Sequence, residues 1–238
     1  MTQQELLFDS SLISPEVQAL LPPGYILRPL ASDDNTKGYL DCLANLTIAP
    51  PLSAEHYSER FQLMKHRGGY YIVVIENTSL ASKSIVACGT VLHELKFYRE
   101  MATCAHIEDI VVSESERGKK FGLHIINQLK WLSAQLGCYK VILNCNEHNV
   151  GFYEKCGLTK KDVQMTLYHT KERKPTDLKM SPAVSPKLPP TTVLSAAING
   201  NGNGNGIGNG IGKKLPPSAL GSSVETVTEA VAEVSISA

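Results

Sequence analysis

Apolar residues recur along the chain with two periods, which separate predicted helices from predicted strands. Phe121, Ile125, Leu129, Leu132 and Leu136 follow one another at steps of four, four, three and four residues, which places them on one face of a helix. Gly137 comes directly afterwards and predicts the end of that helix. Runs rich in β-branched and aromatic residues predict strands at residues 25–30, 70–75, 85–92, 106–112, 139–145 and 164–169.

Capping and terminating residues predict further helices. Residues 32–34 (SDD) can cap a helix that reaches about residue 45, and Ser53 opens another helix with aromatic residues at helical spacing. Short helices are expected at residues 15–21 and 149–155. The main body then has the order β-α-α-β-β-β-α-β-α-β, which predicts a mixed α/β domain with one central sheet.

Composition divides the chain into three parts. Residues 1–24 are expected to form an N-terminal arm, residues 25–174 the α/β domain, and residues 175–238 a low-complexity tail. The tail holds several prolines and an Asn/Gly repeat at 199–212, which has almost nothing to bury and predicts disorder. A weak amphipathic helix is an alternative for the last part of the tail, where one helical face would carry Val224, Val227, Val231 and Val234. A frayed acidic tail is the favoured interpretation.

Charge and cysteine usage exclude several classes. Lys plus Arg and Asp plus Glu both number 23, so the net charge is zero and gives no basic footprint for nucleic acid. No apolar run is long enough to span a membrane, and the first residues do not resemble a signal peptide. The six cysteines form no C-x-x-C pair. We therefore expect a reduced, cytoplasmic protein without a metal site.

The main chemical signal is a strand that leads through a turn and a glycine-bearing loop into the long helix. The loop reads RGKKFG at residues 117–122. Unpaired N–H groups and the helix dipole favour a phosphate at such a helix start, and three basic side chains add positive charge. The spacing fits neither a Walker A loop nor a dinucleotide fingerprint. A phosphate site is predicted, with an ordinary basic helix start as the alternative.

A second signal is the segment NVGFYEKCG at residues 149–157, which follows the strand at 139–145. Together the two signals resemble the GNAT acetyltransferase superfamily, whose acetyl-CoA loop follows the strand that holds the thioester. The segments HIEDIVV (106–112), GCYK (137–140) and Leu46-Thr47 narrow the resemblance to the glucosamine 6-phosphate N-acetyltransferase family. The resemblance covers about residues 22–168. It implies a GNAT fold, with a mixed central sheet flanked by helices.

The resemblance also implies site residues. Acetyl-CoA would be bound by Ile110, Val111, Val112, Arg117, Gly118, Lys119, Lys120, Phe121, Gly122, Asn149, Phe152 and Tyr153. Glucosamine 6-phosphate would be bound by Thr47, Lys96, Phe97, Tyr98, Arg99, Glu108, Asp109, Tyr139, Lys140 and Tyr168. The family's active sites form across a homodimer, so a homodimer is expected, with the last strand lending a contact to its neighbour. The product would serve UDP-N-acetylglucosamine synthesis.

Direct acetyl transfer needs three functions, and the sequence offers a candidate for each. Glu108 or Asp109 could accept the proton of the sugar ammonium, directly or through water. A backbone N–H near Val111 could donate to the oxyanion. Tyr153 could protonate the leaving thiolate. Because no acetyl-enzyme is needed, cysteine is not expected to act as a nucleophile.

Three positions depart from the family's pattern. Lys120 stands where many GNAT proteins have glycine, and Asn144 where the family usually offers a carboxylate. Tyr168 stands where the last strand commonly carries arginine, whose charge a tyrosine cannot supply. His169, Arg173 or Arg99 could compensate. Two alternatives therefore stay open: a GNAT enzyme for another amine, and an acetyl-CoA-binding scaffold with little catalysis.

Overall fold

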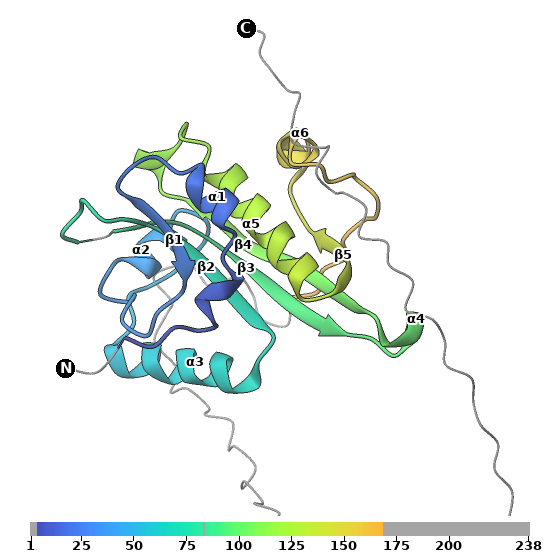
Figure 1. Cartoon of the computed structure of the whole chain (residues 1–238), viewed down its shortest axis with the longest axis horizontal. Helices are drawn as coiled ribbons and strands as arrows, with labels where there is room; N and C mark the ends of the chain where they lie inside the picture. The colour runs from blue at the N-terminus through green and yellow to red at the C-terminus, as the bar shows by residue number, and fades with distance from the viewer. Residues whose placement is uncertain (1–3, 83, 169–238) are drawn as a thin grey trace, which may run out of the picture. The chain divides into compact units, whose positions relative to one another are not determined.

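The computed structural model describes residues 4–82 and 84–168, and five strands within them form one mixed sheet (Figure 1). The strands lie in chain order across the sheet. All neighbours are antiparallel except β4 and β5, which are parallel. The strands are β1 (Tyr25–Pro29), β2 (Tyr70–Asn77), β3 (Ile85–Leu95), β4 (Thr103–Val112) and β5 (Cys138–Leu143). The predicted mixed α/β architecture is confirmed.

Helices cover both faces of the sheet (Figure 1). One face carries α1 (Pro15–Ala19) and α5 (Phe121–Gln135), and the other carries α2 (Tyr39–Leu43) and α3 (Ala54–Arg67). The shorter elements lie at turns and chain connections. They are η1 (Ser10–Leu12), α4 (Tyr98–Met101), η2 (Glu114–Glu116), η3 (Glu147–Asn149) and α6 (Val150–Lys155).

Alternating strand residues supply two hydrophobic cores, one for each face. On β2, Val73 and Ile75 pack in the core under α5, whereas Ile72 and Val74 pack in the core under α2 and α3. The predicted apolar stripe of α5 is confirmed. Its residues Phe121, Ile125, Leu129 and Leu132 are at most 1% exposed. Each such side chain contributes about 1.5–3 kcal/mol through burial, so this stripe is a main anchor of the helix.

The predicted start of α3 is confirmed, but the helix predicted at residues 32–45 is mostly wrong. Ser53 caps α3 by accepting a hydrogen bond from the His56 N–H at 3.2 Å. Asp34 is instead fully buried, where it accepts hydrogen bonds from Arg28 at 2.8 Å and from the Ala31 N–H at 2.7 Å. Since these bonds hold residues 32–38 in turns, α2 begins only at Tyr39.

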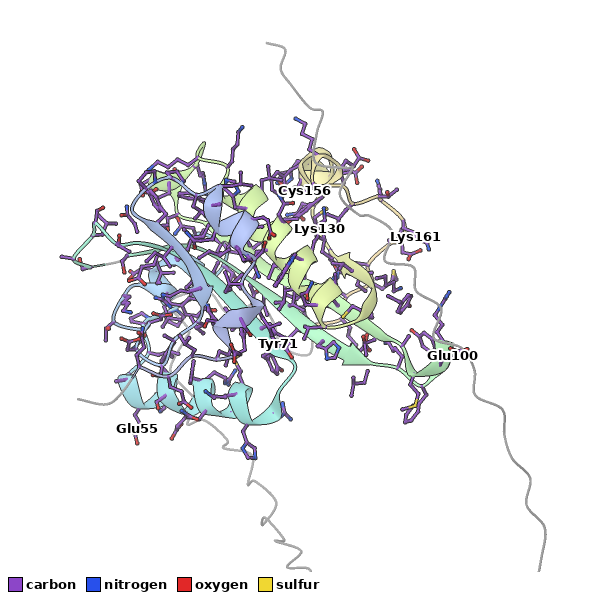
Figure 2. The ribbon with its side chains drawn as sticks, viewed as in Figure 1. Glu55, Tyr71, Glu100, Lys130, Cys156 and Lys161 are labelled. Carbon is purple, nitrogen blue, oxygen red and sulfur yellow. The ribbon has the colours of Figure 1, made fainter. Side chains whose placement is uncertain are left out.

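The N-terminal segment is fastened to α5 by a buried glutamine. Gln128 is 0% exposed, and its side chain accepts from the Ser14 N–H at 2.8 Å and donates to the Leu12 carbonyl at 2.9 Å. Two residues further along α5, on a different side of the helix, Lys130 donates to the Cys156 carbonyl at 2.7 Å (Figure 2). Helix α5 is therefore tied both to the start of the chain and to α6.

The last predicted strand is not found in its described part, residues 164–168, which have no regular structure. Val163, Met165 and Leu167 alternate with polar residues, yet they are 78–90% exposed. A strand needs a hydrogen-bonding neighbour, and no described strand pairs with these residues. His169 and the whole predicted tail lie outside the described residues. None of the described helices is long and apolar enough to cross a membrane.

Candidate active site

The centre of the site is a bulge in β4. Asp109 and Ile110 together face Gly89 of β3, because the pairing between the two strands shifts by one residue between Glu108 and Val111. Asp109 adopts a φ of 55°, in the left-handed region. The bulge therefore bends the strand at two adjacent carboxylates.

The bulge also reverses which residues of β4 face α5. Before it, Ala105 and Ile107 pack in the core under α5; after it, Ile110 and Val112 pack against the same core. In a regular strand, side chains two apart share a face, so odd and even positions could not both point to α5. Asp109 is the extra residue that changes the phase of the strand.

Strands β4 and β5 part directly beside the bulge. Their last parallel pair is Ile107 and Leu143, and beyond it β4 continues without β5. A cleft of about 250 Å³ opens where the strands separate. Its lining combines both strand ends with the start of α6: Leu46, Ile107, Glu108, Asp109, Ile110, Leu143, Asn144, Cys145, Asn146, Asn149 and Tyr153. Five predicted site residues thus line one cleft: Glu108, Asp109, Ile110, Asn149 and Tyr153.

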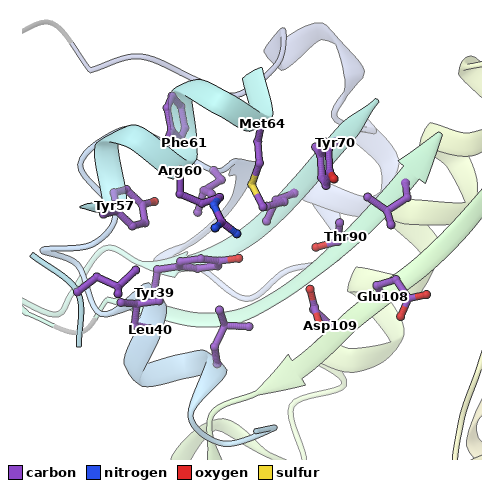
Figure 3. A pocket seen from close by; sticks show the side chains of 15 residues that line it. Tyr39, Leu40, Tyr57, Arg60, Phe61, Met64, Tyr70, Thr90, Glu108 and Asp109 are labelled. Atoms are coloured by element: carbon purple, nitrogen blue, oxygen red, sulfur yellow. The ribbon is translucent and has the colours of Figure 1, made fainter. Parts of the chain in front are cut away.

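A second cavity of about 350 Å³ lies on the other side of the same carboxylates, beneath α2 and α3 (Figure 3). Leucine, isoleucine, phenylalanine and methionine side chains make up much of its wall. Polar groups enter it from Tyr39, Arg60, Tyr70, Thr90, Glu108 and Asp109, among others. Since Glu108 and Asp109 line both the cleft and this cavity, they stand at the boundary between the two.

The titratable groups at this boundary are shifted toward their neutral forms. Partial burial raises the pKa of Glu108, and the neighbouring Asp109 charge raises it further. Burial of its carboxyl group also raises the pKa of Asp109, although the residue as a whole is exposed to solvent. The pKa of Tyr153 is raised, chiefly by burial. A carboxylate with a raised pKa is a stronger base, and the phenol stays protonated at neutral pH.

The predicted phosphate-binding loop leads into α5 beside the cleft. Gly118 and Lys120 have φ values of 86° and 63°, so Lys120 occupies a left-handed position that glycine adopts without strain. The first turn of α5 offers N–H groups that have no intrahelical partner. A Cβ on Gly122 would lie 3.3 Å from the Phe152 ring, so glycine lets α6 approach the loop.

Lys119 supports this loop rather than extending freely from it. Its ammonium lies 2.7 Å from the carboxylate of buried Glu116 and 2.9 Å from the Tyr25 hydroxyl. Glu116 also accepts from Tyr25 at 2.9 Å. Lys119, Glu116 and Tyr25 therefore form a closed network that joins the loop to β1. Arg117 and Lys120 are exposed at the same loop.

Most residues predicted to bind the phosphate of glucosamine 6-phosphate lie away from both cavities, at the tip of the β3–β4 hairpin. Phe97 is 98% exposed there, and α4 is in fact a turn in which Arg99 has a φ of 52°. The Arg99 guanidinium lies 5.2 Å from the centre of the Tyr139 ring, and the Lys140 ammonium lies 5.5 Å from it. We call these four residues, together with Lys96 and Tyr98, the hairpin tip.

The structure does not bring the hairpin tip to the carboxylates of the same chain. Lys140 pairs with Cys104, four residues before Glu108 on β4, which is about 13 Å along a strand. Thr47 is exposed in the loop after α2, and its neighbour Leu46 lines the cleft. Tyr168 is 72% exposed and lines neither cavity.

The cavity beneath α2 and α3 includes residues that the sequence reasoning missed, such as Tyr39, Arg60 and Thr90. Tyr39 belongs to no motif that the sequence analysis identifies, and the pairing of Thr90 with Glu108 appears only when the register is known. Asn144, noted as a departure from the family pattern, does line the cleft.

One group of described residues could offer ligand atoms to a metal. Glu94, Cys104 and His106 place such atoms within 4.8 Å of one another. The Glu94 carboxylate already forms an ion pair with Lys96 and lies 2.8 Å from His106 Nε2. An ammonium at this carboxylate opposes the binding of a cation.

A mixed sheet whose fourth strand bulges and parts from the fifth, beside a glycine-bearing helix start, defines the class of GNAT acetyltransferases. The family model described as "Acetyltransferase (GNAT) family" matches residues 33–158, and the chain belongs to this family. The expected GNAT fold is confirmed.

Named relatives narrow the comparison. The chain is 46% identical over 153 residues to glucosamine 6-phosphate N-acetyltransferase 1 of Dictyostelium discoideum, which covers 64% of this chain and 96% of that protein. It is 40% identical over 147 residues to glucosamine 6-phosphate N-acetyltransferase of Candida albicans, covering 61% and 97%. The crystal structure of glucosamine-6-phosphate N-acetyltransferase from Arabidopsis thaliana superposes with a TM-score of 0.59 at 37% identity, covering 61% and 99%.

Proposed function

We propose that this chain transfers the acetyl group of acetyl-CoA to the amine of D-glucosamine 6-phosphate, giving N-acetyl-D-glucosamine 6-phosphate without an acyl-enzyme. The observation that carries the proposal is the position of Glu108 and Asp109 between two cavities. One cavity reaches Tyr153 and the other reaches α2 and α3. Two substrates can therefore meet at these carboxylates from opposite sides. The relatives named for this reaction align with the whole GNAT region.

The cleft between β4 and β5 fits the acetyl donor. Acetyl-CoA carries an amide-containing arm and a diphosphate, and β4 offers backbone groups of Ile110, Val111 and Val112 that β5 leaves without a partner. The loop at residues 117–122 follows directly, and its helix start suits the diphosphate. Asn149 and Tyr153 line the cleft from the opposite wall, and Phe152 packs near Gly122.

Each reacting group then has a partner in the chain. Glu108 or Asp109 takes a proton from the sugar ammonium, and the raised pKa values of both carboxyls favour that step. A backbone N–H near Val111 stabilises the negative charge that develops on the carbonyl oxygen. Tyr153 supplies a proton to the departing thiolate. Asn144 adds a neutral amide to the cleft, so the base must come from β4.

The sugar phosphate is proposed to bind the hairpin tip of a neighbouring protomer. Within one chain, the backbone of Lys140 lies about four strand residues from that of Glu108, or about 13 Å along the sheet, and Lys140 lines neither cavity. Arg99 and Lys140 supply positive charge at an exposed tip, where a second protomer can use it, whereas the Lys96 ammonium is paired with Glu94. This arrangement supports the proposal of a homodimer with shared active sites.

The cysteines support a reducing location such as the cytoplasm. All six are free thiols, and four of them are buried. In such a compartment, the product would serve the synthesis of UDP-N-acetylglucosamine.

A thiol-release assay tests the proposal. Purified protein is mixed with acetyl-CoA and a panel of amines: glucosamine 6-phosphate, glucosamine, another amino-sugar phosphate and a polyamine. Turnover on glucosamine 6-phosphate well above the others is the expected result. Preferential turnover on another amine would show that the acceptor is not glucosamine 6-phosphate. The exposed position of Tyr168, which contributes to neither cavity, is one reason to include other amines. Acetyl-CoA binding without turnover on any amine would instead indicate a scaffold.

A further inference from the structure

The buried hydroxyl of Thr90 has no hydrogen-bond partner among the described residues. The residue is 4% exposed, and its Oγ1 makes no hydrogen bond to any of the residues that the structure describes. Buried polar side-chain atoms in folded proteins nearly always have a partner, because an unpaired buried hydroxyl costs free energy. The hydroxyl therefore requires an explanation that packing does not give.

The position of Thr90 points to a ligand. It is directly opposite Glu108 in the pairing of β3 with β4, and it lines the cavity beneath α2 and α3 together with Glu108 and Asp109. Figure 3 shows its hydroxyl directed into that cavity, on the wall that also carries the Asp109 carboxylate. The hydroxyl thus faces the space where the acceptor meets the base.

The surroundings favour a specific contact over a general polar wall. Leu92, Ile72 and Met64 line the same cavity with apolar groups. The Tyr57 hydroxyl at its edge is already bonded to the Ala31 carbonyl at 3.0 Å. Directly opposite residues in an antiparallel pair have Cβ atoms about 4.5–5.5 Å apart. Thr90 and Glu108 can therefore contact neighbouring atoms of one small molecule.

We propose that Thr90 is a specificity-determining residue whose hydroxyl hydrogen-bonds the sugar hydroxyl next to the reacting amine. This inference rests on the proposed function and deepens it. While Glu108 or Asp109 receives the proton of the amine, Thr90 fixes the orientation of the ring. A sugar that lacks the neighbouring hydroxyl leaves Thr90 unpaired and is selected against. Sites built to bond a substrate hydroxyl discriminate strongly in this way.

Two variants separate the hydroxyl from the shape of the side chain. Thr90→Val keeps the branched shape and removes the hydroxyl, and Thr90→Ser keeps the hydroxyl and removes the methyl group. We expect Thr90→Val to lower kcat/KM for glucosamine 6-phosphate by about 10-fold or more, with Thr90→Ser closer to the wild type. Both should bind acetyl-CoA as the wild type does. Thr90→Val should melt at the same temperature as the wild type or higher, since an unpaired buried hydroxyl is gone.

Analogues of the sugar phosphate lacking the hydroxyl on either carbon next to the amine complete the test. The wild type should prefer the full substrate over one of these analogues, and Thr90→Val should largely lose that preference. Equal kcat/KM and equal preference in wild type and Thr90→Val overturn the proposal, as does an equal loss in Thr90→Ser and Thr90→Val. A wild type inactive on glucosamine 6-phosphate overturns the proposed function and this inference together. An active wild type with an unchanged Thr90→Val variant overturns only the role of Thr90.

Discussion

Gly89 lies so close to Ile110 that the β4 bulge requires glycine at this position. A Cβ on Gly89 would lie 2.5 Å from Ile110 Cδ1 and 2.6 Å from Ile125 Cγ2, closer than non-bonded carbon atoms approach. The bulge places two residues opposite one, so Ile110 is turned toward α5 over the empty face of Gly89. The active-site corner and the core under α5 thus depend on the same missing side chain.

Gly89→Ala is therefore expected to destabilise the domain by about 1–3 kcal/mol, because it overpacks a buried site. Urea unfolding followed by circular dichroism measures the change. Adding Ile110→Val removes Cδ1 and should recover part of the loss. Gly151→Ala is the matched control, since nothing lies within 4 Å of a Cβ there, and alanine favours the helix. Equal stability of Gly89→Ala and the wild type would contradict this account.

Tyr153→Phe should lower kcat by about 10²–10⁴-fold while leaving the acetyl-CoA Kd nearly unchanged, because only the proton donor is lost. This phenol is protonated at neutral pH, and burial raises its pKa further. Steady-state kinetics and calorimetric titration with acetyl-CoA measure the two quantities. Tyr71→Phe, whose ring packs against Phe8, is the control for general loss of a tyrosine hydroxyl. A Tyr153→Phe variant with normal kcat removes Tyr153 from the mechanism.

The raised pKa of Glu108 predicts opposite effects on stability and activity. Folded Glu108 holds its proton more tightly than in the unfolded chain, where its pKa is about 4.3. Its contribution to stability is therefore present below that pKa and is lost as the pH rises through the folded pKa. Glu108→Gln should be more stable than the wild type at pH 7, and the difference should vanish below about pH 4.

If Glu108 is the base, kcat/KM of the wild type should fall on acidification, with a midpoint above about 4.3. Glu108→Gln should lose most of its activity, and the remaining kcat/KM should no longer fall on acidification. Thermal melts and rates measured from pH 4 to pH 8 provide both comparisons. Asp109→Asn, tested in parallel, identifies the base if the acidic limb persists in Glu108→Gln.

Shared active sites predict complementation between two defective variants. Lys140→Ala should raise the KM for glucosamine 6-phosphate, and Tyr153→Phe should lower kcat. A dimer with one copy of each has one intact site, if Lys140 serves the Tyr153 of its partner. Random mixing should therefore restore about a quarter of the wild-type sites. Activity that merely averages the two variants would show that each site uses residues of a single chain.

The sequence predicts best those elements whose signal is local. The stripe of α5 and its terminal Gly137 follow from spacing alone, and the structure confirms both. Asp34 resembles a helix cap in sequence but is bound by Arg28, six residues earlier and on a neighbouring strand. An ion pair between a turn residue and a strand residue leaves no periodic pattern in the sequence, so spacing alone places the start of α2 too early.

The candidate site also has features that the sequence predicts and features that depend on the folded sheet. The order of the strand, loop and helix around Glu108 is readable from the chain, and the structure brings Glu108, Asp109, Asn149 and Tyr153 to one cleft. The parting of β5 from β4 and the pairing of Thr90 with Glu108 depend on sheet register, which a single sequence does not state. The distance of the hairpin tip from the carboxylates likewise becomes visible only when β5 is placed.

The phase change at Asp109 has a consequence for how this chemistry could be lost or acquired. Residues on either side of Asp109 already face their proper cores, so a chain shortened by this one residue would keep the same inside and outside along the whole of β4. It would straighten the strand and remove the corner where the two substrates are proposed to meet. A single-codon deletion could thus convert the enzyme into an inert domain of similar architecture, and a single-codon insertion could do the reverse.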